Sequence, residues 1–298
     1  MKSEAAAVGT SGEPPVPPAK PAPSGRRAGR DLRAAIIVGL SLSGLIFATL
    51  FTVRVIWIGV ICAAVGLGAY ELATALRAGG FTIPRIPVAL AGAAVPAAAY
   101  AQGTDGLVLA FFIAVIVAIG WRAYDPTPGD LLRDVPATVF ALAYTGCLGG
   151  FAALLSQPSD GPRRVIVFIA TAALNDVGGY AAGVLSGGRH KLAPRISPGK
   201  SWEGVGGSIA AGCVCAGLMF PFLLHRSTWL GIVFGLAAVA ASTMGDLGES
   251  MLKRDIGIKD MGHLLPGHGG VMDRLDSLLA TAPVAYLLLT AWAPLVTA

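Results

Sequence analysis

Residues 228–249 read TWLGIVFGLAAVAASTMGDLGE, an apolar run that ends in two acidic side chains. A spanning helix needs about 20 mainly apolar residues, because a rise of 1.5 Å per residue then covers the roughly 30 Å hydrocarbon core. Asp246 and Glu249 are three positions apart, so both project from one face of such a helix at its end. The run therefore predicts a membrane helix that carries two carboxylates at a membrane surface.

The composition of the whole chain is that of a membrane protein. Of its 298 residues, 54% are hydrophobic and 13% are charged, whereas about a quarter of the residues of a typical soluble domain carry charge. We predict an all-α integral membrane protein with about nine transmembrane helices. The predicted segments are residues 34–52, 55–76, 86–100, 105–121, 135–156, 163–185, 205–224, 228–249 and 275–296.

The first 32 residues differ from the rest. They are rich in Ala, Pro, Gly and Ser, and the prolines between positions 14 and 23 oppose a helix. We interpret residues 1–32 as a disordered tail and residues 33–298 as the multispanning catalytic domain. No apolar stretch follows Met1 directly, so the tail is not a secretory signal peptide. The basic cluster before the first apolar run predicts a cytoplasmic amino terminus.

The distribution of basic residues supports nine spans. With the tail inside, 18 of the 22 Lys and Arg residues fall in the tail and the cytoplasmic connections. The other four fall in connections on the opposite side: Arg54, Arg163, Arg164 and Arg226. The positive-inside rule then places the amino terminus inside and the carboxyl terminus outside. Two cytoplasmic connections, residues 186–204 and 249–275, are long and polar, so we expect the active site at the cytoplasmic face of the carboxyl-terminal half.

The second of these connections lies within residues 245–276, GDLGESMLKRDIGIKDMGHLLPGHGGVMDRLD. Asp273 and Asp276 repeat the spacing of Asp246 and Glu249, so four carboxylates could converge on one site. Mg²⁺ takes one or two carboxylates and completes its shell with water and substrate phosphates. We predict Asp246 and Asp273 as metal ligands. Glu249 and Asp276 are further candidates that could instead cap helices or form ion pairs.

Basic side chains are interleaved with these acids. Lys253, Arg254, Lys259 and Arg274 can hold phosphate oxygens, Arg as a fork and Lys as a point charge. In the following Gly-rich turn, His268 either contacts phosphate or orders the loop. A purely basic patch would favour anionic lipid head groups, but the alternation of acids and bases favours a metal and polyphosphate site. The four cysteines lie inside apolar runs without CxxC spacing, so neither a zinc site nor a disulfide framework is indicated.

The other polar connection, residues 189–204, reads RHKLAPRISPGKSWEG and could hold a second part of a nucleotide. Its Gly199-Lys200-Ser201 is similar to the end of a P-loop, but Pro194 replaces the first glycine of that motif, so we reject a Walker site. Upstream, Asp176 lies within a predicted span, where an ionisable group is a functional hypothesis by default. Glu71, also within a span, is left open between a structural and a functional role.

Together these motifs resemble those of phosphatidate cytidylyltransferases. The resemblance is carried by Ser250 to Arg254, Lys259-Asp260, the turn PGHGG at 266–270, Asp273 to Asp276, Asn175-Asp176 and SPGKSWEG at 197–204. The family commonly has Lys and Thr where this chain has Gly199 and Ser201, so Gly199 is left out of the site. The match covers the carboxyl-terminal half of the chain, and nothing catalytic is carried over to the amino-terminal half.

The resemblance implies transfer of CMP from CTP to phosphatidic acid, which gives CDP-diacylglycerol and pyrophosphate. It also implies dependence on Mg²⁺ with a second cation such as K⁺, a homodimer in the cell's inner membrane with the site facing the cytoplasm, and no nucleic-acid partner. The implied catalytic residues are Lys253, Arg254, Lys259, Asp260, His268 and Arg274. The implied substrate-binding residues are Asn175, Asp176, Ser197, Lys200, Ser201, Glu203, Gly269 and Gly270.

Two alternatives remain open. A CTP-dependent kinase of a polyprenol or another lipid alcohol would need the same cations and membrane pocket, but would transfer the γ-phosphate. A membrane transporter would suit Gly-interrupted spans with an intramembrane Asp176. Against transport, no internal repeat relates the two halves of the chain.

Overall fold

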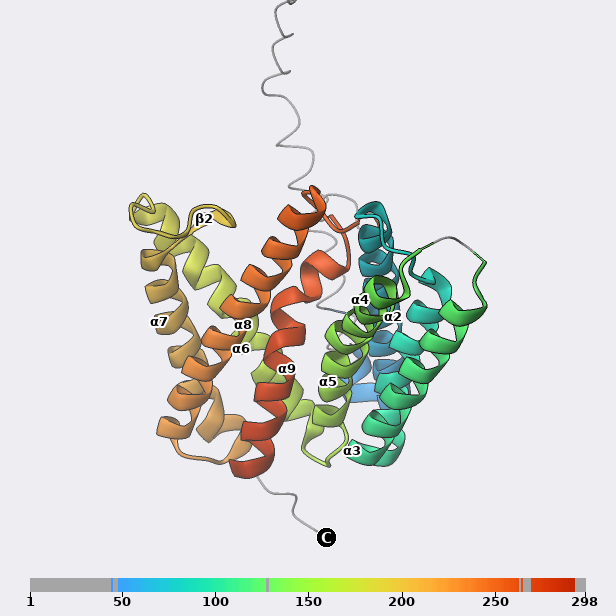
Figure 1. Cartoon of the computed structure of the whole chain (residues 1–298). Coiled ribbons are helices and arrows are strands. Elements are labelled where there is room, and N and C mark those ends of the chain that lie inside the picture. The colour runs from blue at the N-terminus through green and yellow to red at the C-terminus, as the bar shows by residue number, and fades with distance from the viewer. Residues whose placement is uncertain (1–43, 45–47, 127–128, 263, 265–268, 293–298) are drawn as a thin grey trace, which may run out of the picture.

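The computed structural model describes residues 44, 48–126, 129–262, 264 and 269–292. The predicted tail, most of the first predicted span and His268 lie outside these residues. The described chain forms an almost wholly helical bundle (Figure 1). Its elements are α2 Arg54–Ala78, α3 Arg85–Tyr124, α4 Leu131–Leu142, η1 Ala143–Cys147, α5 Leu148–Ser156, α6 Gly161–Leu185, β1 Lys191–Ala193, β2 Ser197–Ser201, α7 Trp202–Met219, η2 Phe220–Leu224, α8 Thr228–Ile256 and α9 Met272–Trp292.

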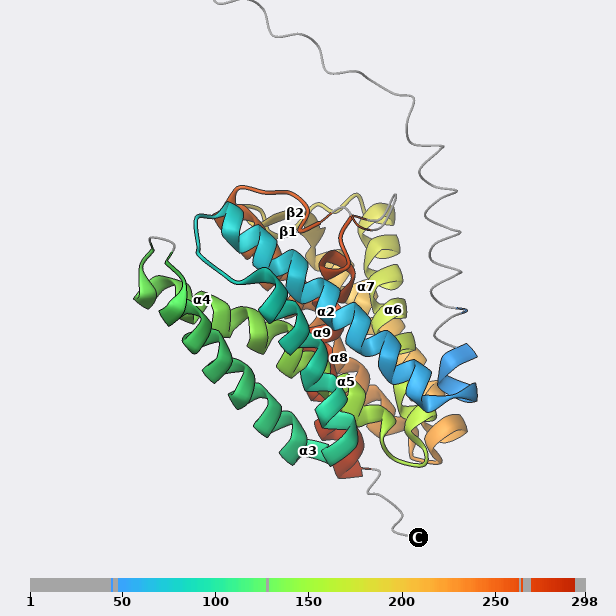
Figure 2. The same cartoon turned by 90° about the vertical axis from the view of Figure 1, so that its right-hand side faces the viewer.

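In the described part of the chain, seven helices are long and apolar enough to cross a membrane, as in a multi-pass membrane protein. One of them, α3, contains two of the nine predicted spans. Gly103 leaves the helical conformation with φ 70° and ψ −150°, and a Cβ added at Gly106 would overlap the carbonyl oxygen of Ala98. Ala98 and Gly106 would be about 12 Å apart along a straight helix. The two arms of α3 therefore fold back beside each other (Figure 2).

The connections that carry the polar motifs lie at one end of the bundle, at the top of Figure 1. The β1–β2 segment, the α8–α9 connection and the chain after α2 share this end. The bend of α3 and the connections α5–α6 and η2–α8 lie at the opposite end. This alternation is the one predicted from the charges, and it brings the two polar connections together.

One of these connections departs from the all-α prediction. Strands β1 and β2 pair antiparallel, with Lys191 opposite Ser201. Residues 186–204 were predicted only as a polar connection, in which Pro194 and Pro198 oppose a helix. The structure adds a short hairpin to this connection, while the described chain as a whole is mostly helical. Strand β2 lies at the ends of α6 and α7 (Figure 1), and its Ser197 and Lys200 line a cavity together with residues of both helices.

Helix α8 runs past its predicted end at residue 249 and stops at Gly257, which adopts a left-handed φ of 79°. Lys253 and Arg254 occupy the last turn, where positive side chains complement the helix dipole. The predicted loop therefore begins about two turns later. As a result, Glu249 and Lys253 lie one turn apart on one helix face.

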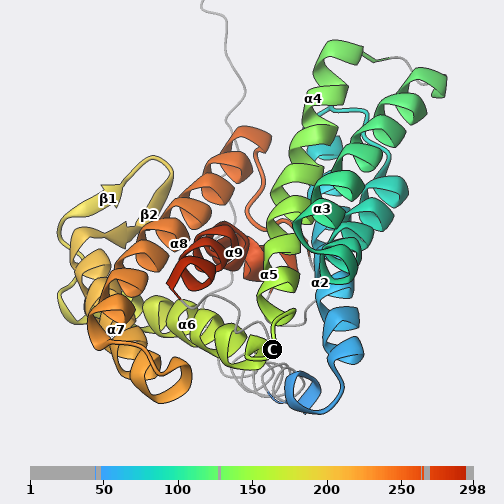
Figure 3. The ribbon, with the colours of Figure 1, turned by 90° about the horizontal axis from the view of Figure 1, so that it is seen from below.

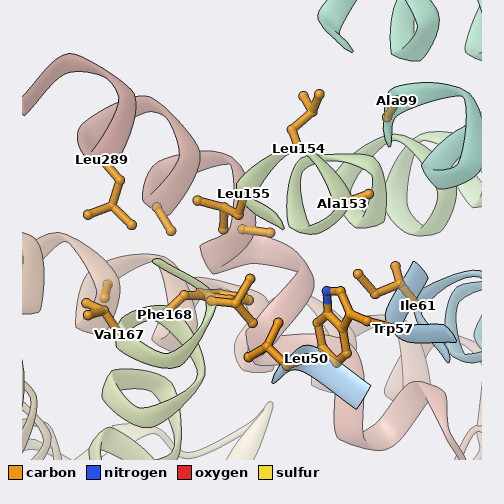
Figure 4. Close-up of a cluster of buried hydrophobic side chains, with 14 of the residues drawn as sticks. Leu50, Trp57, Ile61, Ala99, Ala153, Leu154, Leu155, Val167, Phe168 and Leu289 are labelled. Carbon is orange, nitrogen blue, oxygen red and sulfur yellow. The ribbon is translucent and has the colours of Figure 1, made fainter. Parts of the chain in front are cut away.

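Helix α9 lies in the middle of the bundle, in contact with α2, α5, α6 and α8 (Figure 3). Around the carboxyl-terminal half of α9, apolar side chains from four helices point toward one another (Figure 4). Among them are Trp57 of α2, Leu155 of α5, Phe168 of α6 and Leu289 of α9. Each is less than a tenth exposed. The packed core leaves the polar first turn of α9 at the end that carries the motifs.

Helices α6 and α7 approach each other closely through glycine residues. A Cβ added at Gly207 of α7 would overlap Ala182 Cβ and the Gly178 carbonyl of α6. Gly207→Val is therefore expected to destabilise the protein by about 1–3 kcal/mol, the usual cost of overpacking. The measurement is the melting temperature in detergent. Gly206→Val is the matched control, because no atom lies within 4 Å of its added Cβ; equal melting temperatures of the two variants would contradict the close packing.

Candidate active site

A cavity of about 520 Å³ opens between α6, the β1–β2 hairpin, α7 and α8. This volume is in the range of small-molecule sites. Six predicted site residues line it, from three elements, α6, β2 and α8: Asn175, Asp176, Ser197, Lys200, Ser201 and Asp246. Glycines of α6 and of the following loop form part of the wall, which lets a ligand approach the backbone closely. The fold therefore joins three sequence motifs around one space.

The α6 wall carries Asn175 and Asp176. Asn175 is buried, its carbonyl accepts a hydrogen bond from Ser208 Oγ at 3.0 Å, and its side-chain Oδ1 makes no hydrogen bond within the described residues. Asp176 is exposed to the cavity and lies within electrostatic range of Asp246 and Lys200. A buried polar atom without a partner is costly, so the free oxygen of Asn175 is available to a ligand at this wall.

The opposite wall is built around an ion pair between β2 and α8. Lys200 Nζ donates to Asp246 Oδ2, and both side chains are about a quarter exposed. The neighbouring Ser201 caps α7, because its hydroxyl accepts a hydrogen bond from Gly204 N at 3.1 Å. The Lys200 ammonium group is thus held at the cavity, where it can bind an anionic ligand.

Glu203 lies beside the cavity rather than on its lining. Its Oε1 accepts hydrogen bonds from the backbone N of His190 at 3.2 Å and from the His190 ring at 2.7 Å. These contacts fasten the start of the hairpin to the first turn of α7. The predicted substrate-binding role of Glu203 therefore has an alternative in this geometry, which is to orient the hairpin that carries Lys200.

A second charged cluster lies on α8 and α9. Lys253 Nζ contacts Glu249 Oε2 at 2.6 Å and Asp273 Oδ1 at 2.9 Å. The Asp273 carboxylate also accepts hydrogen bonds from Met261 N at 3.1 Å and Gly270 N at 2.8 Å. The side chains are nearly buried, with exposed fractions of 16% for Lys253, 1% for Glu249 and 7% for Asp273. Lys253 and two amides therefore already occupy the Asp273 carboxylate.

The remaining predicted residues surround these two groups. Arg254 Nε donates to Ile196 O at 3.3 Å and so connects the end of α8 to the hairpin. Lys259 and Asp260 are exposed on the loop after α8, and Arg274 is exposed on the first turn of α9. Asp276 is hydrogen-bonded to Glu249 and to the Ser277 amide. Gly269 has a left-handed φ of 80° beside Asp273, and His268 lies outside the described residues.

The four predicted metal ligands thus separate into two settings. Asp246 faces the cavity, whereas Glu249, Asp273 and Asp276 are engaged with Lys253, with amides or with each other. Within the residues that the structure describes, no group of three or more His, Cys, Asp or Glu side chains is spaced to hold a metal ion. Oxygen donors with only one or two protein carboxylates still fit Mg²⁺, since substrate phosphates and water complete its shell.

Sequence reasoning missed part of the site. Ser242 lines the cavity four residues before Asp246, and Tyr180 does so four residues after Asp176. Helical spacing from the predicted residues could have found both, because positions i and i+4 share a face. Glu71 of α2 was left open, and its carboxylate contacts the start of α9, where Oε2 accepts a hydrogen bond from Met272 N at 2.8 Å.

Comparison with known proteins gives consistent matches across the chain. The model of the cytidylyltransferase family matches residues 33–292. The phosphatidate cytidylyltransferase of Mycobacterium bovis is 40% identical over 97% of this chain and 99% of its own length. That of Mycobacterium leprae is 42% identical over 89% of each chain. That of Haemophilus influenzae is 47% identical over 36% of this chain and 39% of its own.

Proposed function

The chain belongs to the cytidylyltransferase family, and we propose that it is an enzyme of phospholipid biosynthesis that transfers CMP from CTP to phosphatidic acid. The products are CDP-diacylglycerol and pyrophosphate. The observation that carries this proposal is the single cavity that gathers Asn175-Asp176, the hairpin motif and Asp246 at one end of a membrane bundle.

In this proposal CTP occupies the cavity. Lys200 holds phosphate oxygens and Asn175 supplies a buried acceptor for an N–H or O–H group of the nucleotide. Glycines of the wall allow the ligand to lie against the backbone. Phosphatidic acid presents its phosphate from the membrane beside α8 and α9, whose basic side chains Lys253, Arg254 and Arg274 flank the approach.

The reaction is a displacement at phosphorus. A phosphate oxygen of phosphatidic acid forms a bond to the α-phosphorus of CTP, the bond from that phosphorus to the bridging oxygen breaks, and pyrophosphate leaves with that electron pair. The attacking oxygen is already anionic, so no proton has to be removed by the protein. The side chains act by aligning the two phosphates and by neutralising charge that develops on the attacking and leaving oxygens.

Asp246 would hold Mg²⁺ at the cavity, with Asp176 beside it. When bound, the ion supplies charge neutralisation on the phosphate oxygens. Asp273 stays a predicted ligand from the sequence, but it would have to release Lys253 to serve as one. A second cation such as K⁺ remains part of the proposal through the family resemblance alone.

The membrane orientation and the oligomeric state of the enzyme are also part of the proposal. The positive-inside distribution supports a cytoplasmic active site, and the resemblance supports a homodimer in the inner membrane. Accessibility of a cysteine introduced at Lys259 to an impermeant reagent tests the orientation. The reagent is added to intact cells and to cells whose membrane has been opened. Labelling only in the opened cells supports a cytoplasmic site, and labelling of intact cells contradicts it.

The reaction itself is tested with purified protein, phosphatidic acid, Mg²⁺ and CTP labelled on the α-phosphate. We expect label in the lipid fraction and an equal amount of pyrophosphate. Label that reaches a lipid alcohol only from the γ-phosphate would identify a kinase instead. The absence of any transfer, with protein that still binds CTP, would overturn the proposal and favour transport.

A further inference from the structure

Glu71 is a buried acid in the amino-terminal half of the chain, far in sequence from every motif described above. It lies on α2 and is 3% exposed. Gly68, one turn earlier on α2, packs against Met272 and Leu275. The face of α2 that carries Glu71 is therefore the face that meets the start of α9.

The carboxylate of Glu71 contacts the backbone at the start of α9 and at the end of the α8–α9 loop. Its Oε2 accepts a hydrogen bond from Met272 N at 2.8 Å, and the Val271 and Leu264 amides lie near it. Gly262 and Gly270 pack so closely that a Cβ added to either would collide with the carboxylate oxygens. These neighbours offer N–H groups and bare glycines, so the site suits a hydrogen-bond acceptor.

The same backbone positions Asp273. Gly270 N, next to the Glu71 carboxylate, donates to Asp273 Oδ2 at 2.8 Å. Met261 N, next to Gly262, donates to Asp273 at 3.1 Å. Asp273 in turn holds Lys253 at 2.9 Å. A continuous set of contacts therefore runs from Glu71 to the charged cluster of α8 and α9.

The start of α9 offers backbone N–H groups to a hydrogen-bond acceptor at this place. The first turn of a helix has unpaired N–H groups and a partial positive charge, and Glu71 meets the first residue of α9. An acid from another helix thus takes the place of a local capping side chain. The cavity walls, in contrast, come from α6, α7, α8 and the hairpin, and α2 contributes nothing to them.

We propose that Glu71 is a positioning residue, which fixes the described ends of the α8–α9 loop and the first turn of α9 so that Asp273 holds Lys253 in place beside the reacting phosphates. The proposal rests on the CMP transfer proposed above. It assigns to the amino-terminal half a part in the reaction that acts through backbone contacts rather than through substrate contact.

The test compares Glu71→Ala and Glu71→Gln with the wild type in three measurements. Calorimetric CTP binding with Mg²⁺ is expected to keep full stoichiometry and a Kd within about twofold, because the cavity is built without α2. Turnover per CTP-binding chain is expected to fall by about 10- to 100-fold in Glu71→Ala, as when a group that orients a ligand is lost. Glu71→Gln keeps an acceptor for Met272 N, so it should recover part of this loss.

Hydrogen exchange gives a readout that does not depend on activity. Peptides that cover 258–262 and 269–276, which the structure describes, should exchange faster in Glu71→Ala, whereas peptides from α6 and α7 should not change. Ile61 is a buried residue nearer the amino-terminal end of α2. Ile61→Ala is the control for general destabilisation and should leave exchange of the same peptides and turnover per binding chain unchanged.

Several results would overturn the inference. They are unchanged exchange of 258–276 in both Glu71 variants, unchanged turnover per CTP-binding chain, or loss of CTP binding in proportion to turnover. A wild-type protein that makes no CDP-diacylglycerol would instead overturn the proposed function, and the exchange measurement would still decide whether Glu71 holds the loop. If Glu71→Ala does not fold, the same comparisons are made with Glu71→Gln.

Discussion

Exchange of Asp246 for asparagine is expected to lower the turnover of CMP transfer by about 100- to 1,000-fold, the usual effect of removing one preorganised electrostatic group from an active site. Asparagine keeps the size of the side chain but loses the charge that faces the cavity and pairs with Lys200. The concentration of Mg²⁺ at half-maximal rate should rise in the same variant, because a carboxylate ligand is lost. Both quantities come from the labelled-CTP assay at several Mg²⁺ concentrations.

The stability of this variant should hardly change. The Asp246–Lys200 pair is about a quarter exposed, and such partly solvated pairs contribute about 1 kcal/mol or less. Asp255→Asn is the matched control, since Asp255 is exposed on the same helix and outside the cavity lining; it should keep wild-type turnover. A turnover of Asp246→Asn within tenfold of the control, with unchanged Mg²⁺ dependence, would remove Asp246 from the site.

Local sequence patterns were sufficient for the parts of the fold that depend on period and charge. The apolar runs predicted a multispanning helical protein, and seven helices of the described chain are long and apolar enough to cross a membrane. The distribution of Lys and Arg predicted both polar connections at one end of the bundle, where the structure has them (Figure 1). The spacing of three put Asp273 and Asp276 on one face of α9, with Asp273 in its first turn. Gly103 lies between two predicted segments, residues 86–100 and 105–121, but only its positive φ shows that the chain turns back there.

The partners of the charged residues could not be predicted in this way. Lys253 lies between Glu249, four residues away, and Asp273, twenty residues away. Glu71 meets Met272 across 201 positions of sequence. Helical period states which side chains share a face, but the contact between two faces depends on how whole helices pack. For this reason the convergence of four carboxylates on one metal site was expected, whereas in the structure Asp246 pairs with Lys200 at the cavity and Glu249 and Asp273 pair with Lys253.

Replacement of Lys253 by methionine should cost both activity and stability. Methionine fills a similar space, but it leaves the nearly buried carboxylates of Glu249 and Asp273 without their cation. Removing one partner of a buried ion pair costs about 3–5 kcal/mol. We therefore expect a clear fall of the melting temperature in detergent, together with loss of CMP transfer at temperatures where the variant is folded.

A second substitution separates the two effects. In the double variant Glu249→Gln with Lys253→Met, one of the two unpaired charges is removed, and Asp273 keeps its hydrogen bonds from Met261 N and Gly270 N. The double variant should therefore regain a large part of the lost stability but none of the activity. Lys259→Met is the stability control, because that lysine is exposed. A Lys253→Met protein as stable as this control would show that the cation does not hold α8 to α9, and recovery of transfer in the double variant would show that Lys253 is not needed at the phosphates.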